Sequence, residues 1–171
     1  MRNVRTHLLR SNCVCLTWFA AVLFISCSAF AQSNLDDLRT KIAIGSVEEK
    51  RSALLAIRNL HSEEASRLAV PALTDPKELV RSTAPLAIVF LPKSEAARLI
   101  TPLLSDKAEF VRSEAAFALG EVGDSSAVQP LIQRLQKDTG SVRSAAAAAL
   151  GKIGDVSSVD ALNAVIKQKP S

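Results

Sequence analysis

Residues Glu109–Asp124 read E-F-V-R-S-E-A-A-F-A-L-G-E-V-G-D. Their main apolar residues are Val111, Ala115, Ala118, Leu119 and Val122. Spacings of four, three, one and three residues place these side chains on one face of an α-helix, which turns once every ~3.6 residues. The stretch is therefore predicted to be an amphipathic helix that buries this apolar stripe.

The apolar stripe recurs along the chain with a period of 31 residues. One copy follows the stretch and two precede it, and the earliest copy has Glu49 in place of the leading valine. The copies consist of Val142, Ala146, Ala149, Leu150 and Ile153; of Val80, Ala84, Ala87, Ile88 and Leu91; and of Ala53, Ala56, Ile57 and Leu60. A unit of this size cannot bury its stripe alone, so the repeats must stack to form a core. We predict a tandem helical repeat.

The repeat period divides the chain into parts. Residues 32–46 are predicted to form a helix, capped by Ser33-Asn34 and ended by Gly45, that closes the first end of the stack. Four hairpins, each with a helix A and a helix B, are expected at about 47–74, 75–105, 106–137 and 138–167. The A helices are expected at about 47–60, 76–91, 109–122 and 141–153, and the B helices at about 63–73, 94–104, 126–136 and 157–167. Residues 168–171 form a polar tail.

Local signals predict how the helices begin and end. Asp75 with Glu78, and Asp106 with Glu109, have the spacing of capping boxes, with Asp in place of Ser or Thr. Glycines after the last apolar residue of a stripe predict left-handed caps at Gly123 and Gly154.

Prolines and glycines inside the helical patterns predict departures from regular helices. The prolines predict kinks, or in the B helices a break before the proline, at Pro71, Pro85 and Pro102. Gly120 and Gly151 each cost about 1 kcal/mol relative to Ala within a helix, so a neighbouring helix is expected to approach closely there.

The first 31 residues have the features of a secretory signal peptide. Three arginines precede an apolar run from Cys13 to Ile25, and Ala29-Phe30-Ala31 supplies the small residues of a cleavage site. Cleavage is expected after Ala31, which places the protein in the periplasm or outside the cell. An uncleaved anchor is the first alternative, because this segment is barely long enough to span a bilayer. Lipidation at Cys27 is the second, which Phe24 disfavours.

Cleavage changes the charge of the chain. The full sequence has 21 Lys and Arg against 17 Asp and Glu, and loss of the three N-terminal arginines leaves 18 against 17, a net charge of +1. The three cysteines also leave, so the mature chain has no disulfide and no thiol chemistry. A nearly neutral exported chain disfavours a nucleic-acid partner.

Val111–Val128 fits the pattern V-R-x-x-A-A-x-A-L-G-x-[IV]-G-D-x-x-[AS]-V, and Val142–Val159 fits it nearly as well. This pattern resembles a HEAT repeat of the phycobilisome-lyase-like type. The earlier repeats depart from it, since Arg58 and Val89 replace the glycine of the A-L-G motif. The resemblance implies an all-α, right-handed α-solenoid of about four HEAT-like hairpins with a preceding capping helix. It also implies that the B helices line the concave side, where partner proteins dock.

A column of basic residues marks the same place in every repeat, with an aspartate upstream of the last three members. The basic residues are Lys50, Arg81, Arg112 and Arg143, and the aspartates are Asp75, Asp106 and Asp138. Because each base after the first has one acid, we interpret the column as a structural ladder of Arg–carboxylate bonds within and between repeats. The alternative is a stripe that binds anions.

A second set of polar residues is expected on the exposed side of the B helices. Arg67 and Arg98 lie opposite the apolar stripe of their helices, and Gln129 and Asp160 follow in the same frame. We interpret Arg67, Arg98 and Gln129 as protein-binding residues. The alternative is a solvated face without a ligand, because exposed charges are common.

The sequence shows no catalytic motif after residue 31. His61 has neither a second histidine nor a cysteine to share a metal, and is interpreted as a loop residue. Carboxylate pairs such as Glu48-Glu49 lie in first turns of predicted helices, where the helix dipole favours them.

We therefore expect an exported scaffold for protein–protein interaction, with no cofactor, no metal and no catalysis of its own. The resemblance leaves two alternatives, an accessory subunit of a chromophore-lyase-like enzyme and a nucleic-acid-binding module. Both belong to the cytoplasm, so the signal peptide disfavours them. Partner identity and oligomeric state stay open.

Overall fold

The computed structural model describes residues 33–167, and all regular structure within this range is helical. The predicted signal peptide, its cleavage after Ala31, the alternative lipidation at Cys27 and the tail at 168–171 lie outside the described residues. No helix within 33–167 is both long enough and apolar enough to cross a bilayer.

Helices of the two types alternate through the described chain. The A helices are α2 (Val47–Asn59), α4 (Glu78–Ala87), α6 (Glu109–Val122) and α8 (Gly140–Ile153). The B helices are α3 (Glu63–Ala69), α5 (Lys93–Ile100), α7 (Val128–Lys137) and α9 (Val159–Lys167). Short 3₁₀ turns follow α3 and α5, at η1 (Val70–Thr74) and η2 (Thr101–Ser105), and precede α7 and α9, at η3 (Ser125–Ala127) and η4 (Val156–Ser158). Residues 33–44 form a further helix before α2.

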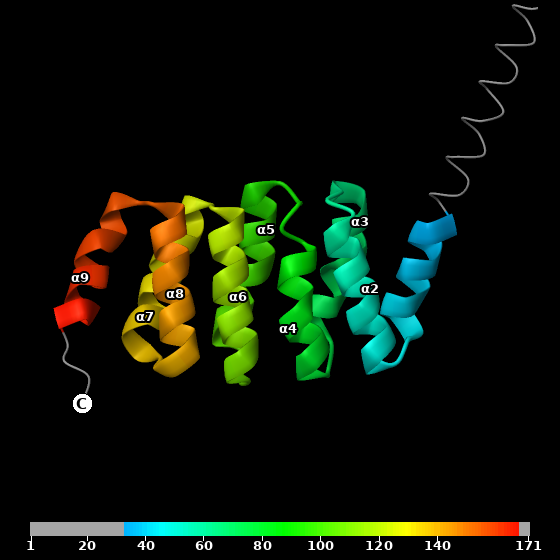
Figure 1. Ribbon diagram of the computed structural model, residues 1–171, viewed down its shortest axis with the longest axis horizontal. Helices are drawn as coiled ribbons and strands as arrows, with labels where there is room; N and C mark the ends of the chain where they lie inside the picture. Colours follow the sequence, from blue (N-terminus) through cyan, green and yellow to red (C-terminus); the bar gives the residue numbers. More distant parts are fainter. Residues whose placement is uncertain (1–32, 168–171) are drawn as a thin grey trace, which may run out of the picture. The chain divides into compact units, whose positions relative to one another are not determined.

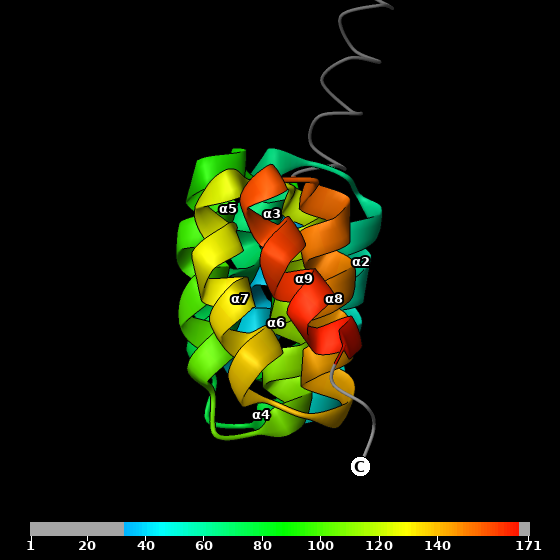
Figure 2. The same ribbon diagram turned by 90° about the vertical axis from the view of Figure 1, so that its left-hand side faces the viewer.

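The compact unit that begins at Leu38 is built by stacking these hairpins. Each A helix packs against the next one, α2 on α4, α4 on α6 and α6 on α8, so that the four stand side by side (Figure 1). In the view along the stack, the B helices α5 and α7 form a second layer beside the A helices α2 and α8 (Figure 2). The predicted all-α solenoid of about four hairpins is confirmed.

The repeated apolar stripe forms the core between the two layers. All five stripe residues of α6 are buried, and Leu119 has no exposed surface. The earliest copy is less complete, because Ala56 of α2 and Leu60, the residue after α2, are exposed while Leu54 is fully buried. In α8, Ala149 occupies the position of Ala56 and packs against Gly120 of the preceding A helix, whereas no A helix precedes α2 in the described part of the chain.

The predicted capping boxes at Asp75 and Asp106 are wrong. The helices begin three residues later, at Glu78 and Glu109, after Lys77 and Ala108 as N-caps. Each aspartate instead accepts a hydrogen bond from the backbone N–H two residues ahead, at 2.8 Å for Asp75 and 2.9 Å for Asp106. This turn leaves the rest of the carboxylate free for the basic column. A true capping box occurs at Ser46 and Glu49.

Helices α3 and α5 end before their prolines. The sequence predicts either this break or a kink. The α-helical part stops at Ala69 in α3 and at Ile100 in α5, and the chain continues as a 3₁₀ turn that contains the proline. Pro85 lies inside α4, which stops two residues later at Ala87 and so is shorter than expected.

The glycine predictions hold at three of four positions. Gly123 and Gly154 adopt left-handed conformations, with φ of 68° and 71°, at the ends of α6 and α8. A Cβ on Gly120 would lie 2.8 Å from the Cα of Ala149, so α8 approaches α6 closely there. A Cβ on Gly151 would meet nothing within 4 Å, and the expected close approach is wrong at this position.

Candidate interaction surfaces

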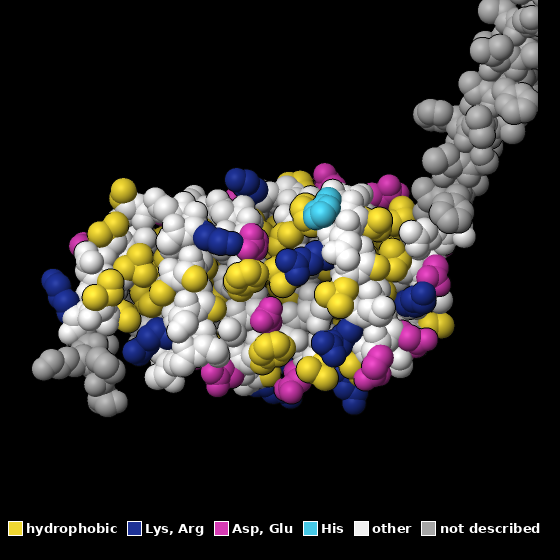
Figure 3. All heavy atoms as spheres, in the orientation of Figure 1, with side chains coloured by type: hydrophobic (Ala, Val, Ile, Leu, Met, Phe, Trp, Pro, Cys, Tyr) yellow, Lys and Arg dark blue, Asp and Glu magenta, His cyan; other side chains and the backbone are white. Residues whose placement is uncertain are grey.

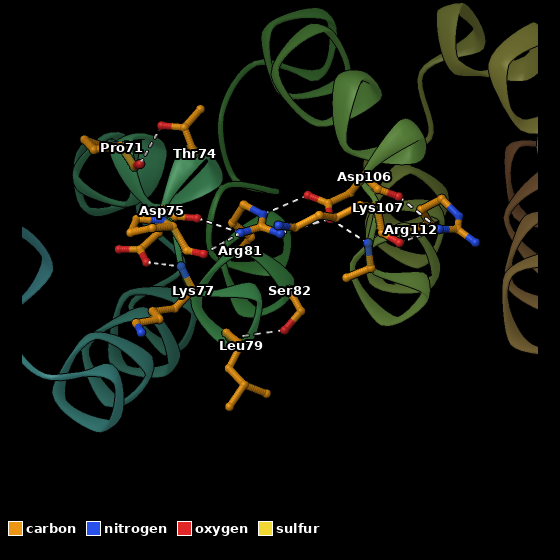
Figure 4. A network of polar contacts seen from close by, with 12 residues as sticks. Pro71, Thr74, Asp75, Lys77, Leu79, Arg81, Ser82, Asp106, Lys107 and Arg112 are labelled. Atoms are coloured by element: carbon orange, nitrogen blue, oxygen red, sulfur yellow. Dashed lines mark hydrogen bonds and ion pairs between the residues drawn. The ribbon is translucent and has the colours of Figure 1, made fainter.

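The basic column lies between consecutive repeats, and Arg81 shows its geometry (Figure 4). Nε and Nη2 of Arg81 donate to the two carboxylate oxygens of Asp106 in the next repeat, at 2.7 and 3.0 Å. Its Nη1 donates to the backbone carbonyls of Asp75 and Pro76, at 2.8 and 3.1 Å. Arg81 is buried although it is charged, so its guanidinium group is occupied within the stack.

The same pattern extends to the other members of the column. Lys50 donates to Oδ2 of Asp75 at 2.7 Å, and Nη2 of Arg112 donates to Oδ1 of Asp138 at 2.9 Å. The last member, Arg143, donates from Nε to the carbonyl oxygen of Asp138 at 2.9 Å and has no acid of a following repeat among the described residues. The structure thus brings all seven residues of the column together, and their stabilising role stays a prediction.

The ion pair between Arg81 and Asp106 shifts the pKa of both groups. Hydrogen bonds from Arg81 lower the pKa of the Asp106 carboxyl against the opposing effect of burial, and the N–H of Ala108 adds to the lowering. The hydrogen bonds that Arg81 donates to Asp106 raise the pKa of Arg81, again against burial. Both groups are charged in this pair, and the guanidinium group of Arg81 is not available to bind an anion from solution.

The predicted protein-binding residues of the B helices differ in their surroundings. Arg67 is half exposed, but its guanidinium group donates to both carboxylate oxygens of Glu95, at 2.9 and 3.2 Å, and to Glu63 at 2.7 Å. The guanidinium group of Arg67 is therefore occupied within the chain, and its role in binding a partner stays a prediction. The sequence signal was present, because Glu63 lies one helical turn before Arg67 and Glu95 lies in the next repeat.

Arg98 and Gln129 are exposed on α5 and α7, as expected for residues opposite the apolar stripe. Arg98 makes no side-chain hydrogen bond or ion pair with another described residue. The structure does not bring Arg67, Arg98 and Gln129 into one site with shared contacts. A partner-binding role for Arg98 and Gln129 stays a prediction.

Large apolar side chains are exposed on the opposite layer, along three consecutive A helices. They are Leu55 on α2, Leu79 on α4, and Phe110 and Phe117 on α6, with exposed fractions between 40% and 57%. Figure 3 shows these helices from that side, with yellow apolar side chains among dark blue and magenta charged ones. We call this surface the A face. The sequence interpretation placed no function there.

The A face contains a pocket over α4, with walls from α2 and α6. Its volume is about 170 Å³, and Leu54, Leu55, Leu86 and Phe110 supply the apolar part of its lining. Ser82 and Thr83 lie at its floor on α4, and both hydroxyl groups donate to the carbonyl of Leu79 within their own helix. The lining is completed by charged groups, Arg51, Arg58 and Glu114.

The charged side chains that line the pocket form no ion pairs with one another, unlike those of the basic column. Arg51 and Arg58 are exposed and make no ion pair or side-chain hydrogen bond with another described residue. Burial beside the apolar walls raises the pKa of the Glu114 carboxyl, and the charge of Arg58 offsets only part of this effect. The pocket thus presents two unpaired guanidinium groups around an apolar centre.

His61 does not take part in either surface. It lies in the turn after α2 with φ of 48°, and its ring meets the edge of Phe90 with centroids 4.7 Å apart. No group of three or more possible metal ligands occurs among the described residues.

Comparison with known proteins finds a match for the later repeats. A family model described as HEAT repeats matches residues 96–171. These residues are similar to HEAT repeats. The matched range covers most of α5 and all of α6–α9, which include the two repeats with the A-L-G motif. The HEAT match begins after α2 and α4, whose repeats carry Arg58 and Val89 where the motif has glycine.

The fold as a whole is similar to that of a solved structure. The crystal structure of an engineered protein, determined by a structural genomics consortium, aligns with a TM-score of 0.59 at 19% sequence identity. The alignment covers 80% of this chain and 73% of the engineered protein, and at this identity it bears on fold alone. No curated protein shows significant sequence similarity to the chain.

Proposed function

We propose that the protein is an exported HEAT-repeat scaffold that binds partner proteins and performs no catalysis of its own. HEAT repeats in residues 96–171 favour this function, because stacked repeats form broad surfaces on which other proteins dock. Val111–Val128 resembles repeats of the phycobilisome-lyase-like type. We use this resemblance only for the structure of the repeat and infer no lyase activity from it.

The proposal rests on one contrast. The buried charged groups are bonded within the stack, whereas large apolar side chains remain exposed on its surface. Buried charges such as Arg81 and Asp75 are bonded inside the stack. By contrast, Phe110 and Phe117 remain 57% and 40% exposed on one helix, beside Leu79 of the previous repeat. Apolar side chains that gather on a protein surface commonly mark a site of protein association.

Export rests on the sequence of the first 31 residues and has its own test. Protein isolated from its native host should begin at Gln32, as mass spectrometry of the intact chain would show. Soluble cytoplasmic protein that retains Met1 would contradict export. Export would then no longer count against a cytoplasmic enzyme subunit.

The scaffold function is tested by capture followed by reconstitution. The purified chain should retain a protein from the compartment in which it is found, and the same protein made separately should bind it with a saturable stoichiometry in calorimetry. A chain that retains no protein under these conditions, or that consumes a small molecule without a partner, would contradict the proposal.

A further inference from the structure

The pocket of the A face has a size suited to one bulky side chain. An apolar cavity of ~150 Å³ holds a benzene molecule in another protein, and this pocket has about 170 Å³. Its apolar lining comes from three consecutive A helices through Leu55, Leu86 and Phe110. Anchoring residues at protein interfaces commonly fill pockets of this kind, surrounded by contacts that exclude water.

The charges at the pocket set a second requirement on its occupant. Arg51 and Arg58 line the same pocket from α2 and are separated by seven residues, or roughly 10 Å along a helix that rises ~1.5 Å per residue. Arg67, Arg81 and Arg112 all find a carboxylate within the stack. Since Arg51 and Arg58 do not, an occupant with carboxylates would supply the partners that the fold leaves out.

The one acid of the pocket does not neutralise this charge. Glu114 lies on α6 and makes no ion pair with either arginine, although Arg58 is near enough to influence its charge. Two guanidinium groups against one carboxylate leave the pocket with a positive excess. This excess is local, because the chain after residue 31 has 18 basic residues against 17 acidic ones.

We propose that this pocket binds a segment of a partner protein that carries a large apolar side chain between two acidic residues. In an extended segment, alternate side chains share one face and the chain advances ~3.3 Å per residue. Two acids four residues apart, with the apolar side chain midway between them, therefore all face the pocket, and the acids span roughly 13 Å, within reach of the long side chains of Arg51 and Arg58. The apolar side chain between them enters the pocket beside Phe110. The inference rests on the proposed scaffold function and adds the place and the chemistry of binding.

The test is selection of random twelve-residue peptides displayed on phage against the purified chain. Enriched peptides should carry an aromatic or branched apolar residue with an acid two residues before it and another two residues after it. One enriched peptide, made synthetically with a fluorophore, should bind at least about tenfold more weakly to Phe110→Ala and to Arg51→Glu/Arg58→Glu, the loss expected of anchor residues. Added salt should weaken its binding to the unsubstituted chain.

Arg98→Glu is the matched control, because Arg98 is also exposed and unpaired but lies in the other layer. It should bind the peptide with unchanged affinity. Thermal melts should show that all variants stay folded, and Arg51→Gln/Arg58→Gln replaces the charge reversal if the latter unfolds.

Enrichment of peptides without acids, or of none, would overturn the proposal. So would a peptide whose binding is lost in Arg98→Glu and kept in the Arg51/Arg58 variants. That last result would leave the scaffold function standing and move its site to the B helices. The scaffold function itself fails only if capture and reconstitution find no protein partner.

Discussion

A single aspartate joins three segments of the stack. The carboxylate of Asp106 accepts from Arg81 of the previous repeat and from the N–H of Ala108, and its backbone carbonyl accepts from Arg112 at 2.9 Å. The side chains of Arg81 and Asp106 are each only 10% exposed. Removal of the acid therefore leaves a buried guanidinium group without its counter-ion. An uncompensated buried charge strongly destabilises the folded state.

Asp106→Asn should lower the free energy of unfolding at neutral pH by about 3–5 kcal/mol, the usual cost of breaking a buried pair. The pKa of Asp106 is lowered from 3.8 in the folded state, so its contribution is present above that value and is lost as the pH falls below it. The difference between the variant and the unsubstituted chain should thus shrink in acid. Denaturant melts at several pH values measure it, and a difference independent of pH would contradict the pairing.

Glu114 should behave in the opposite sense. Its pKa is raised from 4.5, because burial disfavours the charged form, so the folded chain loses stability as the pH rises through and above that value. Glu114→Gln should therefore raise the melting temperature at pH 7 and leave it unchanged below pH 4. An equal effect at both pH values would show that the charge of Glu114 is not the cause.

At the scale of elements, the spacing of α6 and α8 depends on the absence of a side chain. A Cβ at residue 120 would lie 2.8 Å from the Cα of Ala149 and 3.0 Å from its Cβ. Backbone cannot move aside as a flexible side chain can, so the two helices would have to separate. Gly151 occupies the same position of the next repeat, with open space around it.

The two glycines give a matched pair of substitutions. Gly120→Ala should destabilise the chain, because overpacking costs about 1–3 kcal/mol and exceeds the gain of ~1 kcal/mol that Ala offers in a helix. Gly151→Ala should instead stabilise it by about 0.4–1 kcal/mol. The free energy of unfolding from denaturant melts measures both, and the same sign for the two would show that α8 does not approach α6 as described.

The buried stripe can be tested on α6 in the same way. Leu119 is fully buried, so Leu119→Ala should cost about 2–5 kcal/mol. Glu121, two residues away, is exposed and pairs with Lys152 of the next repeat at the surface, where such pairs contribute ~1 kcal/mol or less. Glu121→Ala should change the stability by at most this amount, and equal losses in the two variants would mean that the stripe is assigned to the wrong side of α6.

The sequence predicts the helices well where the pattern is local. The stripe of α6, the left-handed cap at Gly123 and the break before Pro71 follow from periodicity and backbone preference, and all three occur. The predicted capping role of Asp75 is wrong because α4 begins only at Glu78, and the Asp75 carboxylate accepts from the N–H of Lys77 and from Nζ of Lys50 in the previous repeat. Such competition between a local and a distant partner cannot be resolved from spacing alone.

The candidate sites were harder to predict for the same reason. Exposure of Arg67 was evident from its helical position, but the bonds to Glu95 depend on how closely the repeats stack. The A face was missed because Phe110 and Phe117 sit beside the stripe, where an aromatic residue is easily assigned to the core. Their spacing with Glu114 on one side of α6 was the available signal.

At the scale of the molecule, the two layers of the stack have different roles in this account. The basic column and the stripe hold the repeats together, and the exposed A face is left for a partner. This division predicts where a bound protein protects the chain. Helices of the two layers alternate in the sequence, so peptides that each come from one helix resolve the prediction.

Hydrogen–deuterium exchange, measured with and without a partner protein obtained by capture, tests this account most directly. Binding on the A face should slow exchange in peptides from α2, α4 and α6 that contain Arg51, Leu79 and Phe110, and leave α5 and α7 unchanged. Protection confined to α5 and α7, where Arg98 and Gln129 lie, or absent from all of these helices, would contradict it.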